Sequence, residues 1–342
     1  MKSKFKKTIP IILVVFLAIS IVFSVMVGPV EIDFMTAGAI ILNQIGIQLP
    51  NTWSSSEESI IINVRLPRVL MAVTVGAMLG VAGVAAQGLF KNPIADPYII
   101  GISSASSFGA ALIIVLGITL LTFFTIPLVS FLFAMLAITI IYELSKTQLK
   151  LSIGSLLLAG IGLSFFFSAL TSFILFFSED KSHYILSFLM GSFWGANWIE
   201  FYVVLAVMIP GTILLFFYGR DLNAMVFGDD VALSLGINVE QSKRLILFLM
   251  VILSSTAVAF CGTIGFVGLI IPHIMRLIFG SDNRKLVPLS AIAGGLLLLW
   301  ADILARLVMA PRELPVGIFT ALMGGPFFIY LIIKKKQSRE IS

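Results

Sequence analysis

Long apolar stretches separated by short polar ones dominate this chain and predict membrane-spanning helices. A spanning helix needs about 20 mainly apolar residues, and uncharged windows of this order recur along the whole sequence. They cover residues 8–30, 69–90, 97–142, 151–178, 201–219, 245–275, 286–301 and 314–333.

Two of these windows are too long for one helix each. Window 97–142 is expected to turn near Gly117–Pro127, and window 245–275 to break at Gly262–Gly268 and end at Pro272, because glycine and proline interrupt helices. The pattern therefore predicts an all-α polytopic membrane protein with about ten transmembrane helices.

The basic residues predict the orientation of these helices, since cytoplasmic loops carry the excess of Lys and Arg. With a cytoplasmic N-terminus and an even number of spans, all but five of the 22 Lys and Arg residues fall on cytoplasmic segments. The five outside are Arg65, Arg68, Lys181, Arg306 and Arg312. Both termini are thus expected in the cytoplasm, and the positive net charge requires no nucleic-acid partner.

The lysine-rich start of the chain, followed by apolar residues to Val27, could also be a signal peptide. Its apolar run is longer than a signal core, and no small-x-small cleavage pattern follows it. The first transmembrane helix is the preferred interpretation.

An internal repeat is expected between residues 65–101 and 244–280. Their gapless alignment matches an arginine, two glycines, a proline and four apolar residues. The two copies start on opposite sides of the membrane, which is the pattern of an inverted repeat in transporters.

Composition agrees with a single transmembrane domain over residues 1–342. Apolar residues make up 59% of the chain and charged residues 11%, whereas soluble domains carry about a quarter charged residues. The lone Cys261 lies in an apolar run and is interpreted as a packing residue.

The sequence contains no motif that indicates covalent chemistry. There is no Gly-x-x-x-x-Gly-Lys-[Ser/Thr] phosphate-binding loop, and His183 and His273 fall on opposite sides of the membrane, away from any Cys or carboxylate cluster. We therefore expect no catalytic residue, no metal site and no cofactor in this chain, and we interpret His183 as a surface residue.

Intramembrane charge is limited to Asp302 and Arg306, four residues apart on one helix face. They could form a local ion pair near the outer interface or serve in docking or gating. The scarcity of buried carboxylates argues against a proton- or sodium-driven carrier.

Small residues form two stripes at helical spacing. Gly160, Ser164, Ser168 and Ser172 share one face of the fifth span, which indicates either close helix packing or a weakly polar wall of a translocation path. The stripe of Gly76, Gly80 and Gly83 in the second span favours packing.

The longest polar cytoplasmic segment covers residues 220–244. Apolar residues before and after Gly236 predict two short helices hinged at this glycine. The segment could be a connector on the membrane surface or a knob that fits a soluble partner.

Four stretches, in order along the chain, carry a resemblance to a known family. They are Arg65-Leu66-Pro67-Arg68, Gln87–Gly101 with its Lys91-Asn92-Pro93-Ile94-Ala95-Asp96-Pro97 core, Gly262–Arg276, and Ala301–Arg306 followed by Glu313–Gly317. With these stretches the chain resembles the permease subunits of ATP-binding-cassette (ABC) importers for iron–siderophores, haem and cobalamin.

The resemblance implies an assembly in the cytoplasmic membrane. Such permeases pair as dimers of ten-helix subunits around a central path, with two soluble ATPase subunits below and an extracytoplasmic substrate-binding protein above. The resemblance also implies residue roles. Arg65, Arg68 and Arg306 would meet acidic residues of the binding protein, and Asn92 and Ile94 would form a cytoplasmic gate. The ATPase coupling residues would be Leu233, Leu235, Gly236, Ile237, Asn238 and Val239.

A second family gate lies at the start of the fifth span. This chain has Ile153 and Gly154 there in place of small hydroxyl residues, so that gate is left undefined.

The function expected from sequence is inward transport of a metal chelate, driven by ATP hydrolysed on another chain. Ferric siderophore is the first candidate cargo, followed by haem, cobalamin and an oxyanion. An ion-coupled secondary transporter or channel is the alternative, and a membrane sensor or scaffold is a third. The sequence does not distinguish a homodimer from a heterodimer.

Overall fold

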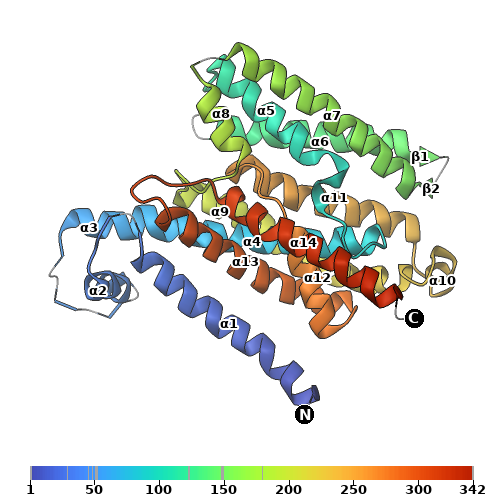
Figure 1. Ribbon diagram of the computed structural model, residues 1–342, viewed down its shortest axis with the longest axis horizontal. Helices are drawn as coiled ribbons and strands as arrows, with labels where there is room; N and C mark the ends of the chain where they lie inside the picture. Colours follow the sequence, from blue (N-terminus) through green and yellow to red (C-terminus); the bar gives the residue numbers. More distant parts are fainter. Residues whose placement is uncertain are drawn as a thin grey trace.

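The computed structural model describes residues 2–28, 30–44, 46–47, 49–50, 53–121, 124–147, 150–178 and 180–340. Met1, Ile341 and Ser342, which belong to the predicted domain, lie outside the described residues. The apolar windows of the sequence form the long helices of a bundle (Figure 1). These helices are α1 (Lys2–Met26), α4 (Leu66–Leu89), α5 (Ile102–Leu116), α6 (Thr125–Ser145), α7 (Ile153–Phe177), α9 (Trp198–Met225), α11 (Val239–Cys261), α12 (Val267–Phe279), α13 (Asn283–Leu307) and α14 (Val316–Glu340).

Short elements connect these helices. They are α2 (Phe34–Gln44), α3 (Ser55–Ser59), the π-helical turn η1 (Ile60–Arg65), the 3-10 turn η2 (Pro97–Ile100), α8 (Ser182–Leu189) and α10 (Asp229–Ser234). A small antiparallel hairpin pairs β1 (Lys146–Thr147) with β2 (Lys150–Leu151).

The predicted all-α membrane fold is confirmed. Seven helices of the described chain are long and apolar enough to span a membrane, and three shorter apolar helices accompany them. The shorter apolar segments are α5 (102–116), α12 (267–279) and the apolar part of α14 (316–330). The number of ten spans stays a prediction, because these three are shorter than a full crossing.

Both predicted helix breaks occur, but the predicted end at Pro272 is wrong, because Pro272 lies inside α12, which continues to Phe279. α5 ends at Gly117, which has a φ of 66°, and α6 begins at Thr125. α11 ends at Gly262, and α12 begins after the irregular 262–266 segment. The two segments of the expected repeat break differently, since Gly83 lies inside α4 whereas the aligned Gly262 ends α11. The inverted repeat therefore stays a prediction.

The core lies where α4 packs along α13. Glycines permit this close approach: a Cβ on Gly76 would lie 2.3 Å from the Gly294 carbonyl oxygen, and one on Gly80 would lie 2.3 Å from that of Ser290. On the same stripe, a Cβ on Gly83 would lie 1.9 Å from the Gly268 carbonyl oxygen of α12. The packing interpretation of this stripe is confirmed.

The connecting elements gather at two ends of the bundle (Figure 1). Both chain termini, α10 and the β1–β2 hairpin lie toward one end, which corresponds to the predicted cytoplasmic side. α2 and α3 lie toward the other. This places the coupling segment and the candidate docking residues at opposite ends.

Candidate functional site

The N-terminal end of α4, which is predicted to face outward, carries a buried ion-pair cluster. Arg68 donates from Nε and Nη2 to Asp302 Oδ1 (3.1 and 2.9 Å) and from Nη1 to Glu313 Oε2 (2.7 Å). Arg306 Nε lies 3.0 Å from Asp302 Oδ2, but its N–H is directed to the Asp302 carbonyl (3.4 Å), so that contact is electrostatic. The cluster joins α4, α13 and the segment before α14.

Two arginines also bind the C-terminal end of α1. Arg306 Nη1 donates to the carbonyls of Ser24 (3.2 Å) and Val27 (2.8 Å), and Arg306 Nη2 donates to Ser24 Oγ (2.7 Å). Arg65 donates to the carbonyls of Val25, Met26 and Val30. The last carbonyls of a helix lack intrahelical partners, and these guanidinium groups supply them.

The structure buries the three arginines that were predicted to meet the binding protein. Arg65, Arg68 and Arg306 are only 4%, 8% and 2% exposed. Helix ends and acidic side chains of the same chain enclose them. Their direct role in docking stays a prediction.

Segment 220–244, which is predicted to be cytoplasmic, contains the end of α9, the short helix α10 and the start of the long helix α11. α10 ends at Ser234, Gly236 follows with a φ of 79°, and Asn238 caps α11 by accepting from the Gln241 N–H (3.2 Å). The predicted second short helix is wrong in extent, because Val239 begins the 23-residue α11. The glycine turn between the two helices lies where it was predicted.

The predicted coupling residues divide into an exposed and a buried group. Leu233 and Leu235 are 57% and 60% exposed, Gly236 and Asn238 are exposed, and Ile237 is half-buried. Val239 is buried in the main core. Exposed apolar side chains that are grouped on a surface are typical of an interaction site. We therefore expect the tip around Leu233 and Leu235 to meet a partner, while Val239 anchors this segment in the core.

Asp229, the first residue of α10, connects this tip to the connection that follows α4. Asp229 Oδ2 accepts from Lys243 Nζ (2.6 Å), and Oδ1 accepts from Lys91 Nζ (3.1 Å). Burial raises the pKa of Asp229, but the hydrogen bonds from Lys243 and Lys91 outweigh it, so the pKa lies below its ordinary value. The ion pairs join α10, α11 and the end of α4.

The candidate gate residues lie next to Lys91 in that connection, which we call the gate turn (residues 91–94). Asn92 is exposed, its Oδ1 accepts from the Ile94 N–H (3.2 Å), and Ile94 is 38% exposed. His273 Nδ1 donates to the Pro93 carbonyl (3.1 Å) and the ring packs edge-on against Phe327 of α14. The gate turn therefore contacts the coupling segment on one side and α12 on the other.

The small-residue stripe of α7 has two parts. Gly160 packs on η2, since a Cβ there would lie 2.6 Å from Ile100 Cα. Ser164 donates to the Gly160 carbonyl (2.8 Å), and Ser168 and Ser172 are exposed. The first part matches the packing interpretation, and the second part leaves a weakly polar face uncovered in this chain.

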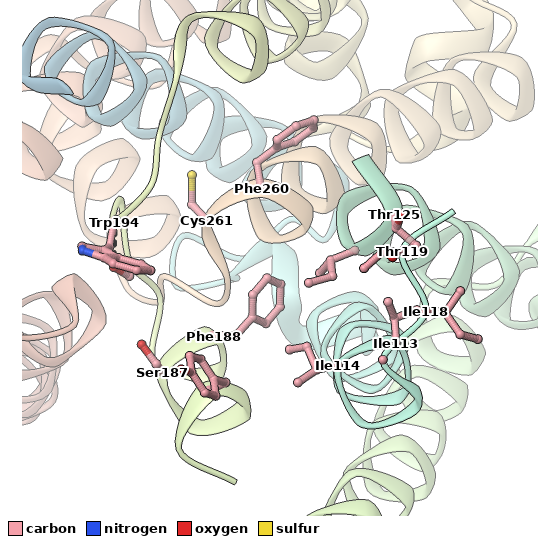
Figure 2. Close-up of a pocket in the computed structure, with 14 residues that line it drawn as sticks. Ile113, Ile114, Ile118, Thr119, Thr125, Ser187, Phe188, Trp194, Phe260 and Cys261 are labelled. Carbon is pink, nitrogen blue, oxygen red and sulfur yellow. Dashed lines mark hydrogen bonds between the residues drawn. The ribbon is translucent and has the colours of Figure 1, made fainter. Parts of the chain in front are cut away.

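An outer cavity of about 440 Å³ lies between α5, α6, α8 and the end of α11. Figure 2 shows Phe188 and Phe260 between the segment with Trp194 and the side chains of Ile113 and Ile114. None of its 14 lining residues is charged. A neighbouring cavity of about 480 Å³ shares Tyr184 and Trp194 and reaches Glu313.

A resident metal would need several ligating side chains close together. Among the residues that the structure describes, no group of three His, Cys, Asp or Glu side chains could hold a metal ion. His183 is exposed beside Tyr184, and Cys261 is buried with a free thiol.

Sequence reasoning missed several residues of these sites. Lys91, Asp229 and Lys243 carry ordinary charges in polar segments, and nothing in their spacing indicates that they meet. Glu313 falls within a matched stretch but shows no sign of pairing with Arg68. Only the packing of helices distant in sequence reveals these contacts.

The sequence profile of the FecCD transport family matches residues 16–334. This chain belongs to the FecCD transport family. It is the permease of an ABC importer for metal chelates. This membership confirms the resemblance seen in the four sequence stretches.

Individual relatives agree with this membership. The hemin transport system permease protein HmuU of Yersinia pestis is 38% identical over 314 residues, covering 90% of this chain and 94% of HmuU. The Fe(3+) dicitrate transport system permease protein FecD of Escherichia coli is 37% identical, covering 83% of this chain and 89% of FecD. A solved inward-facing conformation of a metal-chelate type ABC transporter has a TM-score of 0.82 at 32% identity, covering 96% of this chain and 99% of that one.

Proposed function

We propose that this chain is the membrane subunit of an importer that carries a metal chelate across the cytoplasmic membrane, driven by ATP hydrolysis on a separate subunit. One observation carries the proposal: α10 exposes leucines at its tip and is tied by Asp229 to the gate turn. A partner that moves α10 would thereby displace the segment that carries Asn92 and Ile94.

The proposed assembly contains a second permease subunit, two ATPase subunits and an extracytoplasmic binding protein, in a single transmembrane domain per permease with both termini cytoplasmic. The exposed Ser168 and Ser172 of α7 would face the path between the two permeases. Asn92 and Ile94 would form its cytoplasmic gate, and Leu233, Leu235, Gly236, Ile237 and Asn238 would contact the ATPase.

Arg65, Arg68 and Arg306 would support docking indirectly. Their buried contacts position the end of α1 and the 308–315 connection, and these form part of the outer surface. Exposed Arg312 lies in the same connection. If docking is indirect, Arg312→Glu weakens binding-protein association in a salt-dependent way, whereas Arg68→Lys changes its salt dependence little.

The cargo is proposed to be a metal chelate, with ferric siderophore first and haem or cobalamin as further candidates. The relatives named for hemin and for ferric dicitrate show that cargo differs within the family. Binding of candidate chelates to the cognate binding protein would choose among them.

The energy source is tested by reconstituting the permease with its ATPase in vesicles. Uptake of the chelate should require ATP on the side of the ATPase and should persist with an ionophore. Uptake that continues without any ATPase and collapses with the ionophore would instead show an ion-coupled secondary transporter.

A further inference from the structure

A polar cavity of about 310 Å³ lies at one end of the bundle, apart from the gate turn and the outer cavities. It is lined by Tyr142, Lys146, Leu151, Asn238, Glu240, Gln241 and Arg244. These residues come from the end of α6, the β1–β2 hairpin and the start of α11. We infer that this cavity binds the headgroup of an anionic phospholipid.

Two cations line the cavity without an acidic partner. Lys146 and Arg244 are exposed, and no described carboxylate forms an ion pair with either of them. The one acidic lining residue is already engaged: Glu240 Oε1 accepts from Lys243 Nζ (3.2 Å), and Glu240 Oε2 accepts from the Leu151 N–H (2.7 Å). The cavity therefore has a positive charge available for a phosphate.

The backbone holds these cations in place. Lys146 pairs with Leu151 across the hairpin, and the Leu151 N–H is bound to Glu240. Arg244 lies one helical turn beyond Glu240 on α11. Lys146 on the hairpin and Arg244 on α11 are thus held close together, because Glu240 of α11 binds the hairpin backbone.

The position of the cavity corresponds to the membrane interface. α6 has 21 residues, a length of about 30 Å, which matches the hydrocarbon thickness of a bilayer. Lys146 follows its last residue directly. Tyr142, whose ring packs 5.9 Å from that of Phe248, has the side-chain type that is enriched at this level.

An aliphatic ridge beside the cavity favours a lipid over a free anion or a protein carboxylate. Exposed side chains recur every four residues along the whole of α6 and end beside Lys146. They are Leu128, Leu132, Leu136, Ile140 and Leu144. Acyl chains can lie along this ridge while the phosphate reaches Lys146 and Arg244, as in basic pockets between transmembrane helices that bind lipid headgroups.

The test measures lipid binding to the purified full-length permease, so its outcome does not depend on whether the chain transports a chelate. In lipid nanodiscs and by native mass spectrometry, wild-type permease should bind phosphatidylglycerol in preference to phosphatidylcholine. The double variant Lys146→Gln with Arg244→Gln should bind phosphatidylglycerol about thirtyfold more weakly, because each cation contributes about fivefold. Arg220→Gln, which removes an exposed cation of the same end that does not line this cavity, should bind like wild type.

Three results would overturn the inference. Wild-type permease could show no preference between the two lipids, a comparison that needs no variant. Inorganic phosphate could protect the permease against heat as well as phosphatidylglycerol does, which would show a free-anion site. The double variant could keep its lipid and lose only ATPase association, which would assign the cations to the ATPase interface.

Discussion

Single arginines show how the membrane environment changes the role of a charge. In a lipid environment the free carbonyls of a helix end find no water, so a nearby guanidinium group is retained inside the protein. Arg65 and Arg306 donate to such carbonyls at the end of α1, and Arg68 binds two carboxylates. These arginines therefore hold the outer end of the bundle together.

We expect Arg68→Ala to destabilise the protein markedly, because Asp302 would lose its hydrogen-bonding partner inside the protein. Breaking a buried ion pair costs about 3–5 kcal/mol, whereas the exposed Arg312 should tolerate Arg312→Ala within about 0.5 kcal/mol. Thermal unfolding of the two variants in detergent measures the difference. Equal unfolding temperatures would contradict the structural role of Arg68.

Gly236 offers a second prediction at this scale, because its φ of 79° is unfavourable for side chains with a Cβ. A Cβ at this position would have no other atom within 4 Å, so strain alone should act, at about 1–2 kcal/mol. Gly236→Val should reduce co-purification of the ATPase or uncouple hydrolysis from transport, without loss of membrane insertion. Gly236→Asn should be milder, since asparagine tolerates this conformation better. ATPase recruitment at the wild-type level in Gly236→Val would argue against a coupling role.

At the scale of elements, α10 is too short to be stable alone and depends on its contacts. Within α10, Ala232 is buried and Asp229 binds Lys243 and Lys91. The neighbouring helices are joined to each other, because Asp221 of α9 accepts from Ser242 Oγ of α11 (2.5 Å). The tip is thus a rigid projection attached to α9, α11 and the gate turn together. Such an attachment transmits movement better than a flexible connector would.

Asp229→Asn should weaken the link between α10 and the gate turn. We expect ATP hydrolysis to continue with reduced uptake, measured as chelate imported per ATP hydrolysed in vesicles. Asp230→Asn is the matched control, because the neighbouring Asp230 is exposed and forms no ion pair with a described residue. Identical ratios of chelate imported per ATP hydrolysed in the two variants would show that Asp229 does not couple α10 to the gate turn.

The ion pairs of Asp229 with Lys91 and Lys243 should persist at mildly acidic pH. Because the folded pKa of Asp229 is lowered, its contribution is present above the ordinary carboxyl pKa and is lost only as pH falls through the lower folded value. The transport ratio should therefore hold from neutral to mildly acidic pH. A decline in that ratio confined to wild type near pH 6, absent in Asp229→Asn, would contradict this assignment.

At the scale of the whole molecule, the proposed functions divide between the two ends of the bundle. α10, the hairpin and both termini lie toward one end, and α2 and α3 toward the other (Figure 1). The charge distribution of the sequence predicts that the first end faces the cytoplasm.

Single-cysteine labelling tests this orientation, since Cys261 is the lone cysteine and is buried. In a Cys261→Ser background, Ser234→Cys on α10 should react with a membrane-impermeant maleimide only after the cytoplasmic side is opened. Arg312→Cys should react in intact cells. The reverse pattern would invert the topology.

The sequence by itself determined the long apolar helices, the breaks at Gly117 and Gly262, and the family. These features depend on local order: apolar runs long enough to span a membrane, glycine and proline between them, and motif stretches such as Arg65–Arg68. The turn at Gly117 and the break at Gly262 were predicted because a residue's backbone preferences act at its own position. The glycine stripe of α4 was interpreted correctly because its spacing places small residues on one face of the helix.

Only the tertiary structure decided what the charges do. Arg68 and Asp302 are 234 residues apart, and Lys91 and Asp229 are 138 apart, so no spacing rule could pair them. Charge counting predicted the side of the membrane for the arginines but could not predict their neighbours. Which groups a side chain meets depends on how α1, α4 and α13 pack together, and a buried charge persists only where that packing supplies its partners.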